Sequence, residues 1–290
     1  MNQQIKSLLE RRVQQCVSDT ADTCEKIERK KKSLMKRNGE IIKARATGKV
    51  IDQIENEDYS NIYYLAHFQY LIKQHKRYYI EEEVEKRKAS FYKSSLMADD
   101  EVIEKVDLQV PELELLTDDF RDAETRAPYR YDRRKAVQYA ERWWNDYNPA
   151  YMKFTDDCTN YISQCLRAGG APMRGFPNRS SGWWYNNNNW SYSWSVAHAL
   201  NLYLATSKTG LRAVEVQDPR ELQLGDVICY DFEGDGRFNH NTIVTGKDAY
   251  GYPLVNAHTY NSRMRYWAYE DSSAYTPNIK YKFYTILDDD

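Results

Sequence analysis

The sequence contains no long hydrophobic run. No stretch approaches the roughly 18 to 20 uninterrupted apolar residues that a membrane-spanning helix requires, and the opening MNQQIKSLLERR lacks the apolar core of a signal peptide. We therefore expect a soluble cytoplasmic protein without a membrane partner, with export by a non-standard route left open.

The sequence also has no excess of one charge, and its cysteines are not closely paired. The 41 Lys and Arg nearly balance the 43 Asp and Glu, so the chain has no basic field of the kind that a dedicated nucleic-acid binder carries. The five Cys have neither the paired spacing of a zinc site nor that of a disulfide framework. We expect free thiols, no nucleic-acid partner, and no metal or other cofactor.

Aromatic residues with a polar end are abundant. The chain has 25 Tyr and 7 Trp against 8 Phe, and such rings combine a stacking face with a hydrogen-bonding group, so they need partners or a pocket. The length of 290 residues, with 41% apolar content, is sufficient for one large domain or two modest ones.

The first 125 residues are predicted to form a domain of amphipathic helices and a small antiparallel sheet. Apolar residues recur at helical spacing from Ile5 to about Val50, which indicates one helix or a hairpin of two that Asn38-Gly39 would separate. Such helices could mediate self-association, as in a coiled coil, or dock a partner. Between residues 62 and 110 a period close to two predicts two or three antiparallel strands, although Tyr78–Lys88 could also be helical.

A linker is predicted where the composition changes. Acidic residues dominate from Asp99 to Glu124, and Pro111 and Pro128 interrupt any regular pattern. We place the domain boundary near residue 125, which gives domains 1–125 and 126–290.

The second domain is predicted to have helices first and an antiparallel sheet after them, the signature of an α+β fold. The predicted helices are Tyr131–Asn145 with Asp132 as N-cap, Asp157–Arg167 and Val196–Ser207, and the predicted strands are Asp226–Phe232, Phe238–Thr245 and Gly251–His258.

Cys158 is the candidate nucleophile. It stands in the first turn of a predicted helix, where unpaired backbone N–H groups and the helix dipole favour a thiolate. Asp156 and Asp157 oppose this because nearby carboxylates raise the pKa of a thiol, so an imidazole partner is required. The alternative is a buried apolar side chain like Cys165, one or two turns later on the same helix.

Two predicted strands each offer an imidazole. His240 begins one strand and is the candidate base, while His258 or Asn256 at the end of the next could orient it by bonding its other nitrogen. Asn256 and His258 are two residues apart and point to the same face, so the sequence does not choose between them. A zinc site of Cys158, His240 and His258 is a rival that lacks any close ligand pair.

A resemblance to a known family follows from these motifs. The segment Asp157-Cys158-Thr159-Asn160-Tyr161-Ile162-Ser163-Gln164-Cys165-Leu166 with Gly169-Gly170, preceded by Tyr147-Asn148, Tyr151 and Phe154, closely resembles the signature of the bacterial putative amidase domain family of papain-like cysteine hydrolases. The segments Leu224–Ile228, His240–Gly246 and His258-Thr259 resemble its strand motifs in order, as in related NlpC-type cell-wall peptidases. The resemblance covers about Tyr131 to Tyr284. It implies Cys158 as nucleophile, His240 as base and His258 as third member.

Two further groups are candidates for contacts with the substrate. The first precedes or begins the Cys158 helix, and the second lies in a loop that interleaves aromatic rings with amides, a composition suited to stacking on sugars or peptide planes. The substrate-binding candidates are Tyr147, Asn148, Tyr151, Asp157, Trp183, Trp184 and Trp190. The alternative is that these residues only pack: Trp194 and either Trp183 or Trp184 would fill the core beneath the Cys158 helix.

Together these patterns predict a cysteine amidase or peptidase that cleaves an amide or peptide bond through a thioester. The substrate would be a peptide or a peptidoglycan stem fragment. The alternative function is a non-catalytic module that binds a glycan or peptide on the same fold.

Overall fold

The computed structural model describes residues 3–18, 24–102 and 129–289. The chain divides into two compact units, which we call the first and second units. The first unit comprises Met1–Lys105, Tyr260–Arg265 and Tyr269–Ser273, and the second comprises Val106–Thr259, Tyr266–Ala268 and Ala274–Asp290. Two short segments from the C-terminal part of the chain therefore belong to the first unit, which the sequence did not indicate.

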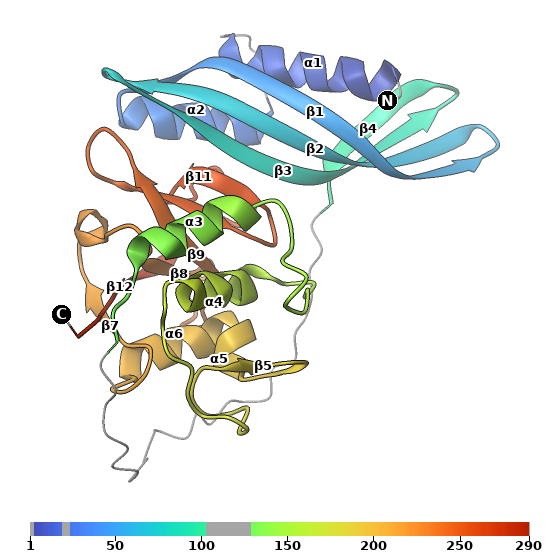
Figure 1. The fold of residues 1–290 in the computed structure, drawn as a ribbon. Helices are drawn as coiled ribbons and strands as arrows, with labels where there is room; N and C mark the ends of the chain where they lie inside the picture. The colour runs from blue at the N-terminus through green and yellow to red at the C-terminus, as the bar shows by residue number, and fades with distance from the viewer. Residues whose placement is uncertain (1–2, 19–23, 103–128, 290) are drawn as a thin grey trace. The chain divides into compact units, whose positions relative to one another are not determined.

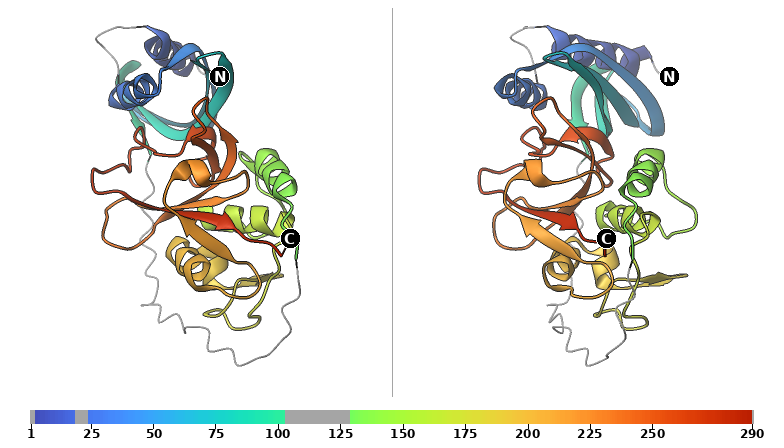
Figure 2. Two further views of the ribbon diagram at one scale, coloured as in Figure 1. Left: turned by 90° about the vertical axis from the view of Figure 1, so that its left-hand side faces the viewer. Right: turned by 60° about the vertical axis from the view of Figure 1, so that its left-hand side comes forward.

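The first unit packs two helices on an antiparallel sheet (Figure 1). Its elements are α1 (Gln3–Val17), α2 (Glu25–Lys36), β1 (Gly39–Asn56), β2 (Tyr59–Gln74), β3 (Arg77–Tyr92) and β4 (Ser95–Glu101). Consecutive strands pair through short turns, and β11 (Ser262–Tyr266) pairs with β3 through Ser262 and Arg263. Both helices lie on the same face of this sheet (Figure 2).

The core of the first unit follows from the period of two in β2. Alternate residues of this strand are buried and pack against the apolar stripes of both helices. The buried residues are Ile62, Tyr64, Ala66, Phe68, Tyr70 and Ile72 of β2, Ile5, Leu9 and Cys16 of α1, and Ile27 and Leu34 of α2. The helices thus use their apolar stripes within the unit, and self-association through them stays a prediction.

The structure corrects part of the N-terminal prediction. The helical pattern does not extend to Val50, because α2 ends at Lys36, Asn38 takes a left-handed φ of 52°, and Gly39 begins an 18-residue strand. Pairing of β1 with β2 along most of its length outweighs the local helical spacing. The antiparallel strands predicted after residue 62 are confirmed as far as Val102, and Tyr78–Lys88 is strand. The predicted linker is wrong at its start, because Asp99–Glu101 pair with β3 as part of β4. The rest of the linker and the boundary near residue 125 lie outside the described residues.

The second unit is α+β, as predicted. Its main elements are α3 (Arg133–Trp143), α4 (Cys158–Ala168), β5 (Tyr185–Asn186), β6 (Asn189–Trp190), α5 (Tyr192–Ser195), α6 (Ala197–Thr206), β7 (Ala213–Val216), a 3-10 turn (Pro219–Glu221), β8 (Val227–Asp231), β9 (His240–Lys247), β10 (Pro253–Ala257) and β12 (Lys280–Ile286). The strands form an antiparallel arrangement in the order β10-β9-β8-β12-β7. The three helices and three strands predicted from the sequence are confirmed.

Local sequence explains how α3 and α4 are placed. Asp132 caps α3 by accepting a hydrogen bond of 3.0 Å from the Lys135 backbone N–H. Every residue of α4 from Cys158 to Leu166 is buried, and its apolar residues pack against Val227, Cys229 and Ile243 of the sheet. The first turn of α4 is therefore held rigidly against β8 and β9.

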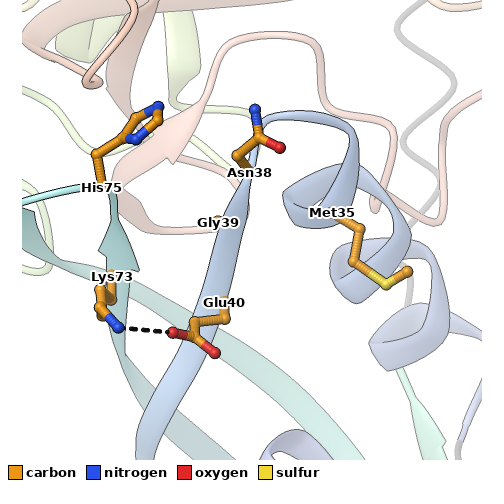
Figure 3. A pocket seen from close by; sticks show the side chains of 6 residues that line it. All are labelled: Met35, Asn38, Gly39, Glu40, Lys73 and His75. Carbon is orange, nitrogen blue, oxygen red and sulfur yellow. Dashed lines mark hydrogen bonds and ion pairs between the residues drawn. The ribbon is translucent and has the colours of Figure 1, made fainter.

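Two general features complete the description. Within residues 3–18, 24–102 and 129–289, no helix combines the length and the apolar character needed to span a membrane. A surface hollow in the first unit is lined by Met35, Asn38, Gly39, Glu40, Lys73 and His75, and Lys73 Nζ lies 3.1 Å from Glu40 Oε1 across it (Figure 3). None of the site residues predicted from the sequence lines this hollow.

Candidate active site

Cys158 is the first residue of α4, and its side chain is buried with 5% exposed. The preceding Asp157 does not cap the helix with its own side chain. Instead, the backbone N–H groups of Asp157 and Cys158 both donate to Thr259 Oγ1, at 3.1 and 3.2 Å. A residue about one hundred positions later thus satisfies amides that the start of a helix otherwise leaves unpaired.

The Asp157 carboxylate joins three other parts of the site. Its Oδ2 lies 2.8 Å from His258 Nδ1. Its Oδ1 accepts hydrogen bonds from Asn160 Nδ2 at 2.8 Å and from the Phe154 backbone N–H at 3.0 Å. The sequence predicted Asp157 as a substrate contact. In the structure, both of its carboxylate oxygens form hydrogen bonds within the protein, around the start of α4.

His258 is bonded through both ring nitrogens. Its Nε2 lies 2.7 Å from the Trp143 carbonyl oxygen, opposite the contact of Nδ1 with Asp157. Each ring nitrogen therefore has an oxygen partner within hydrogen-bonding distance. The ring also stacks on Tyr161 at 4.0 Å and meets the edge of Tyr147 at 5.0 Å. His258 therefore has no ring nitrogen left to orient His240.

Asn256 is likewise engaged with neighbours of its own. Its Oδ1 accepts from Thr245 Oγ1 at 2.7 Å, and its Nδ2 donates to Glu141 Oε1 at 2.9 Å. These bonds tie β10 to β9 and to α3. The sequence left Asn256 and His258 as alternatives for one role, and the structure gives each of them another set of partners.

His240 is the first residue of β9, beside the start of α4. Its neighbour Asn241 donates from Nδ2 to Thr159 Oγ1 at 3.0 Å, and the Asn241 backbone amide also acts on the Cys158 sulfur. The His240 ring is buried, 5.6 Å from Tyr230 and 6.1 Å from Phe232. The structure thus places the strand position of His240 next to the thiol.

The surroundings of Cys158 keep its thiol neutral. Burial raises the pKa of Cys158 and is the largest cause. The Thr159 hydroxyl, whose Oγ1 is 3.7 Å from Sγ, and the Asn241 backbone amide lower the pKa, and the carboxylates of Asp156 and Asp157 raise it by less than these bonds lower it. The helix start therefore does not by itself produce the thiolate expected from the sequence, because desolvation outweighs it.

The aromatic loop has a different role from the one predicted for two of the three tryptophans that were candidates for substrate binding. Trp183 is fully buried and donates to Ser163 Oγ at 3.0 Å, and Trp184 is 1% exposed and donates to the Asn178 carbonyl at 3.0 Å. No ligand can stack on these rings, because the core covers them. This corrects their assignment to substrate binding, and Trp194 shares the core with Trp183.

The other predicted contacts lie closer to the surface. Trp190 is half-buried and stacks on Tyr185 at 6.2 Å, and Tyr151 stacks on Trp194 at 5.9 Å. Asn148 donates to the Tyr139 hydroxyl at 2.9 Å and accepts from the Ala150 backbone N–H. Tyr151 thus connects the segment before α4 with the aromatic loop, through its contacts with Tyr185 and Trp194.

Thr259 is the site residue that the sequence did not single out. Its φ is 77°, a left-handed conformation that is an outlier for a β-branched residue and typically costs about 1–3 kcal/mol. Such strain persists only where the surroundings enforce it, and the anchored His258 directly precedes it. A lone Thr after a strand gives no sequence signal, since only the folded chain brings it to α4.

The zinc site that the sequence left as an alternative depends on the arrangement of the cysteines and histidines. All five cysteines are free thiols, as expected. In the described parts of the chain, no group of three or more His, Cys, Asp or Glu side chains is arranged to hold a metal ion. Cys158, His240 and His258 accordingly do not form the rival zinc site.

Comparison with known families places this site in context. Residues 130–284 match the model of the family described as "Putative amidase domain". The chain belongs to this family, which assigns it hydrolase character at the family level.

Two proteins of Bacillus subtilis are similar to this chain. The chain is 54% identical over 276 residues to the uncharacterized protein YhbB of Bacillus subtilis (strain 168), covering 91% of this chain and 86% of that relative. It is 31% identical over 121 residues to the uncharacterized protein YjcM of the same organism, covering 39% of this chain and 27% of that relative. No solved structure matches the chain significantly.

Proposed function

We propose that the protein is a papain-like cysteine hydrolase that cleaves an amide or peptide bond through a thioester intermediate. The observation that carries the proposal is the position of Cys158, at the first residue of α4 and against the backbone amide that follows His240. This arrangement puts the thiol at the positive end of a helix and beside the strand that begins with the candidate base. Membership of the amidase family supports the same chemistry.

The neutral state of the thiol defines the role of His240. Because burial raises the pKa of Cys158, the thiol needs a base that takes its proton as the sulfur attacks the carbonyl carbon. Both ring nitrogens of His258 already have partners in Asp157 and the Trp143 carbonyl, so His258 does not serve as that base. His240 takes the proton in our proposal and returns it to the leaving amine.

The substrate class that we propose rests on the family resemblance and on the aromatic rings that precede and follow α4. The rings of Tyr151, Tyr185 and Trp190 provide a surface suited to peptide planes or sugars. A peptide or a peptidoglycan stem fragment is the substrate that we propose.

A panel of fluorogenic N-acyl amides and muropeptide fragments tests the proposal. Hydrolysis by the wild type should be lost in Cys158→Ala and retained in Cys165→Ala, which removes a buried thiol from the same helix. Hydrolysis that survives in Cys158→Ala would refute the cysteine mechanism.

One observation favours a second candidate, a binding module on the same fold. Cys158 is buried and its neutral state is favoured, as expected of a thiol that does no chemistry. Calorimetric titration of muropeptides into Cys158→Ala, together with the absence of turnover by the wild type, would identify this function.

A further inference from the structure

The Thr259 hydroxyl has an unusual set of partners. A hydroxyl oxygen has two lone pairs and one proton. The backbone N–H groups of Asp157 and Cys158 fill both lone pairs. The only hydrogen-bonding capacity left to Thr259 Oγ1 is the donation of its own proton, and none of the described residues accepts it.

The same contacts occupy the backbone amides at the start of α4 that could otherwise donate to a substrate oxygen. The Cys158 amide is the group that a helix-borne nucleophile would ordinarily aim at a developing oxyanion. Here this amide is already bonded to Thr259, as is the Asp157 amide. The two amides polarise the Thr259 hydroxyl, because a hydroxyl whose oxygen accepts hydrogen bonds becomes a stronger donor.

The position of the hydroxyl is fixed by its surroundings. His258, the preceding residue, is held by Asp157 on one nitrogen and by the Trp143 carbonyl on the other. Thr259 itself is held in a left-handed conformation that β-branched residues avoid. A donor that is oriented before the substrate arrives is what stabilisation of a transition state requires.

We propose that the Thr259 side-chain hydroxyl is the oxyanion donor of this site and thus a catalytic residue. The proposal rests on the cysteine hydrolase function proposed above. It also identifies the roles of the two helix amides, which act on the oxyanion through Thr259.

The chemical step is as follows. Cys158 Sγ bonds to the carbonyl carbon while its proton passes to His240, and the carbonyl π electrons move to the oxygen. The Thr259 O–H donates to this negative oxygen. When the carbonyl re-forms, the C–N bond breaks, the amine leaves with the proton from His240, and Cys158 retains the acyl group as a thioester that water later hydrolyses.

Two reactions of Cys158 separate this role from a purely structural one. Acylation by p-nitrophenyl acetate passes through a tetrahedral oxyanion, whereas alkylation by iodoacetamide displaces iodide and forms none. Thr259→Val keeps the β-branched shape and removes the hydroxyl, Thr259→Ser keeps the hydroxyl, and Thr259→Ala is a second variant without it. All are made in the full chain, and labelling at Cys158 is followed by peptide mass spectrometry.

We expect acylation of Cys158 to fall roughly 10²–10³-fold in Thr259→Val and Thr259→Ala and to stay within a few-fold of wild type in Thr259→Ser. Alkylation should change little in all three. Acylation of Thr259→Val at or above the wild-type rate would overturn the proposal, because the hydroxyl would then only cap the helix or block the oxyanion position. An equal loss of both reactions would also overturn it, since the role would be structural.

The failure of the underlying function gives a different result. Wild-type protein that is acylated no faster than Cys158→Ala would refute the hydrolase proposal itself, whatever the Thr259 variants do.

Discussion

The two units bury polar groups in different ways. In the first unit, buried cations face carboxylates: Lys30 Nζ lies 2.6 Å from Asp271 Oδ2 and also contacts Glu81, and Arg265 lies 2.9 Å from Asp271. In the second unit, the polar groups at Cys158 include a hydrogen-bonded contact between Asp157 and His258 and one hydroxyl proton that the described residues leave unused.

This difference shows where to look for function. A buried charge costs several kcal/mol unless it is paired, so the pairs of the first unit are what folding requires and do not in themselves indicate a site. Thr259 pairs two amides at the start of α4, but neither its strained conformation nor its unused donor is needed for that pairing. The second unit has both features at Thr259, beside a thiol.

The largest effect is expected from removing the chemistry of the second unit. Cys158→Ala and His240→Ala should each lower kcat/KM by roughly 10⁴–10⁶-fold, and the double variant should lose little more, because a nucleophile and its base act together. Hydrolysis rates of all three variants on the best substrate of the panel measure this. Losses that multiply in the double variant would show that the two residues act independently.

The next largest effect is expected on the free energy of unfolding, when a buried ion pair of the first unit is broken. Burial lowers the pKa of Lys30, but the carboxylates of Asp271 and Glu81 outweigh it and raise the pKa, so this Lys is charged. Lys30→Met removes the cation from Glu81 and leaves Asp271 with Arg265, and it should lower the free energy of unfolding by about 3–5 kcal/mol.

Urea denaturation measures this change, and Lys6→Met is the control. Lys6 is half exposed and lies 3.9 Å from Glu10, so its loss should cost less than about 1 kcal/mol. Equal stability of the two variants would show that the buried pair contributes no more than an exposed one.

A smaller effect concerns the resting state of the thiol. Because the pKa of Cys158 is raised above the ordinary value of 9.0, its alkylation by iodoacetamide should rise about tenfold per pH unit up to and beyond pH 9. Cys165 and Cys229, both fully buried, serve as internal controls. A rate that is already at its plateau below pH 7 would instead show a thiolate–imidazolium pair.

The smallest effect is the acid sensitivity of Glu82 in the first unit. Burial raises the pKa of Glu82, but hydrogen bonds from His67, Gln69 and Arg263 outweigh it and lower the pKa from 4.5 to about 2. The stabilisation is therefore fully present above pH 4.5 and is lost as the pH falls toward 2. The stability difference between wild type and Glu82→Gln should shrink between pH 7 and pH 2.5.

Urea midpoints at the two pH values measure the Glu82 effect, with Glu10→Gln as an exposed control. A difference that does not change with pH would show that the carboxylate of Glu82 is not what stabilises this contact.

The sequence predicts those parts of the structure that local rules determine. Asp132 marks the start of α3, and the apolar spacing around Cys158 places this residue at the start of α4. Alternation predicts β2 for the same reason, since one face of that strand is buried, whereas Tyr78 and Ile80 of β3 lie exposed.

Long-range contacts determine what the sequence does not show. Gly39–Asn56 is a strand because β2 lies beside it, and residues 260–265 join the first unit through pairing with β3. In the site, the bonds of His258 with Asp157 and of Thr259 with the α4 amides connect residues about one hundred positions apart. Pattern rules reach neighbours in sequence and do not reach these pairs.

The most direct test of the account is to trap the acyl-enzyme. Wild type, Cys158→Ala and Cys165→Ala are mixed with p-nitrophenyl acetate, quenched with acid within the first turnover, and mapped by peptide mass spectrometry. The account predicts an acetyl group on Cys158 in wild type and in Cys165→Ala, and no rapid acetylation in Cys158→Ala. Equal acetylation of all three proteins, or an acetyl group at another residue, would contradict a thioester at Cys158.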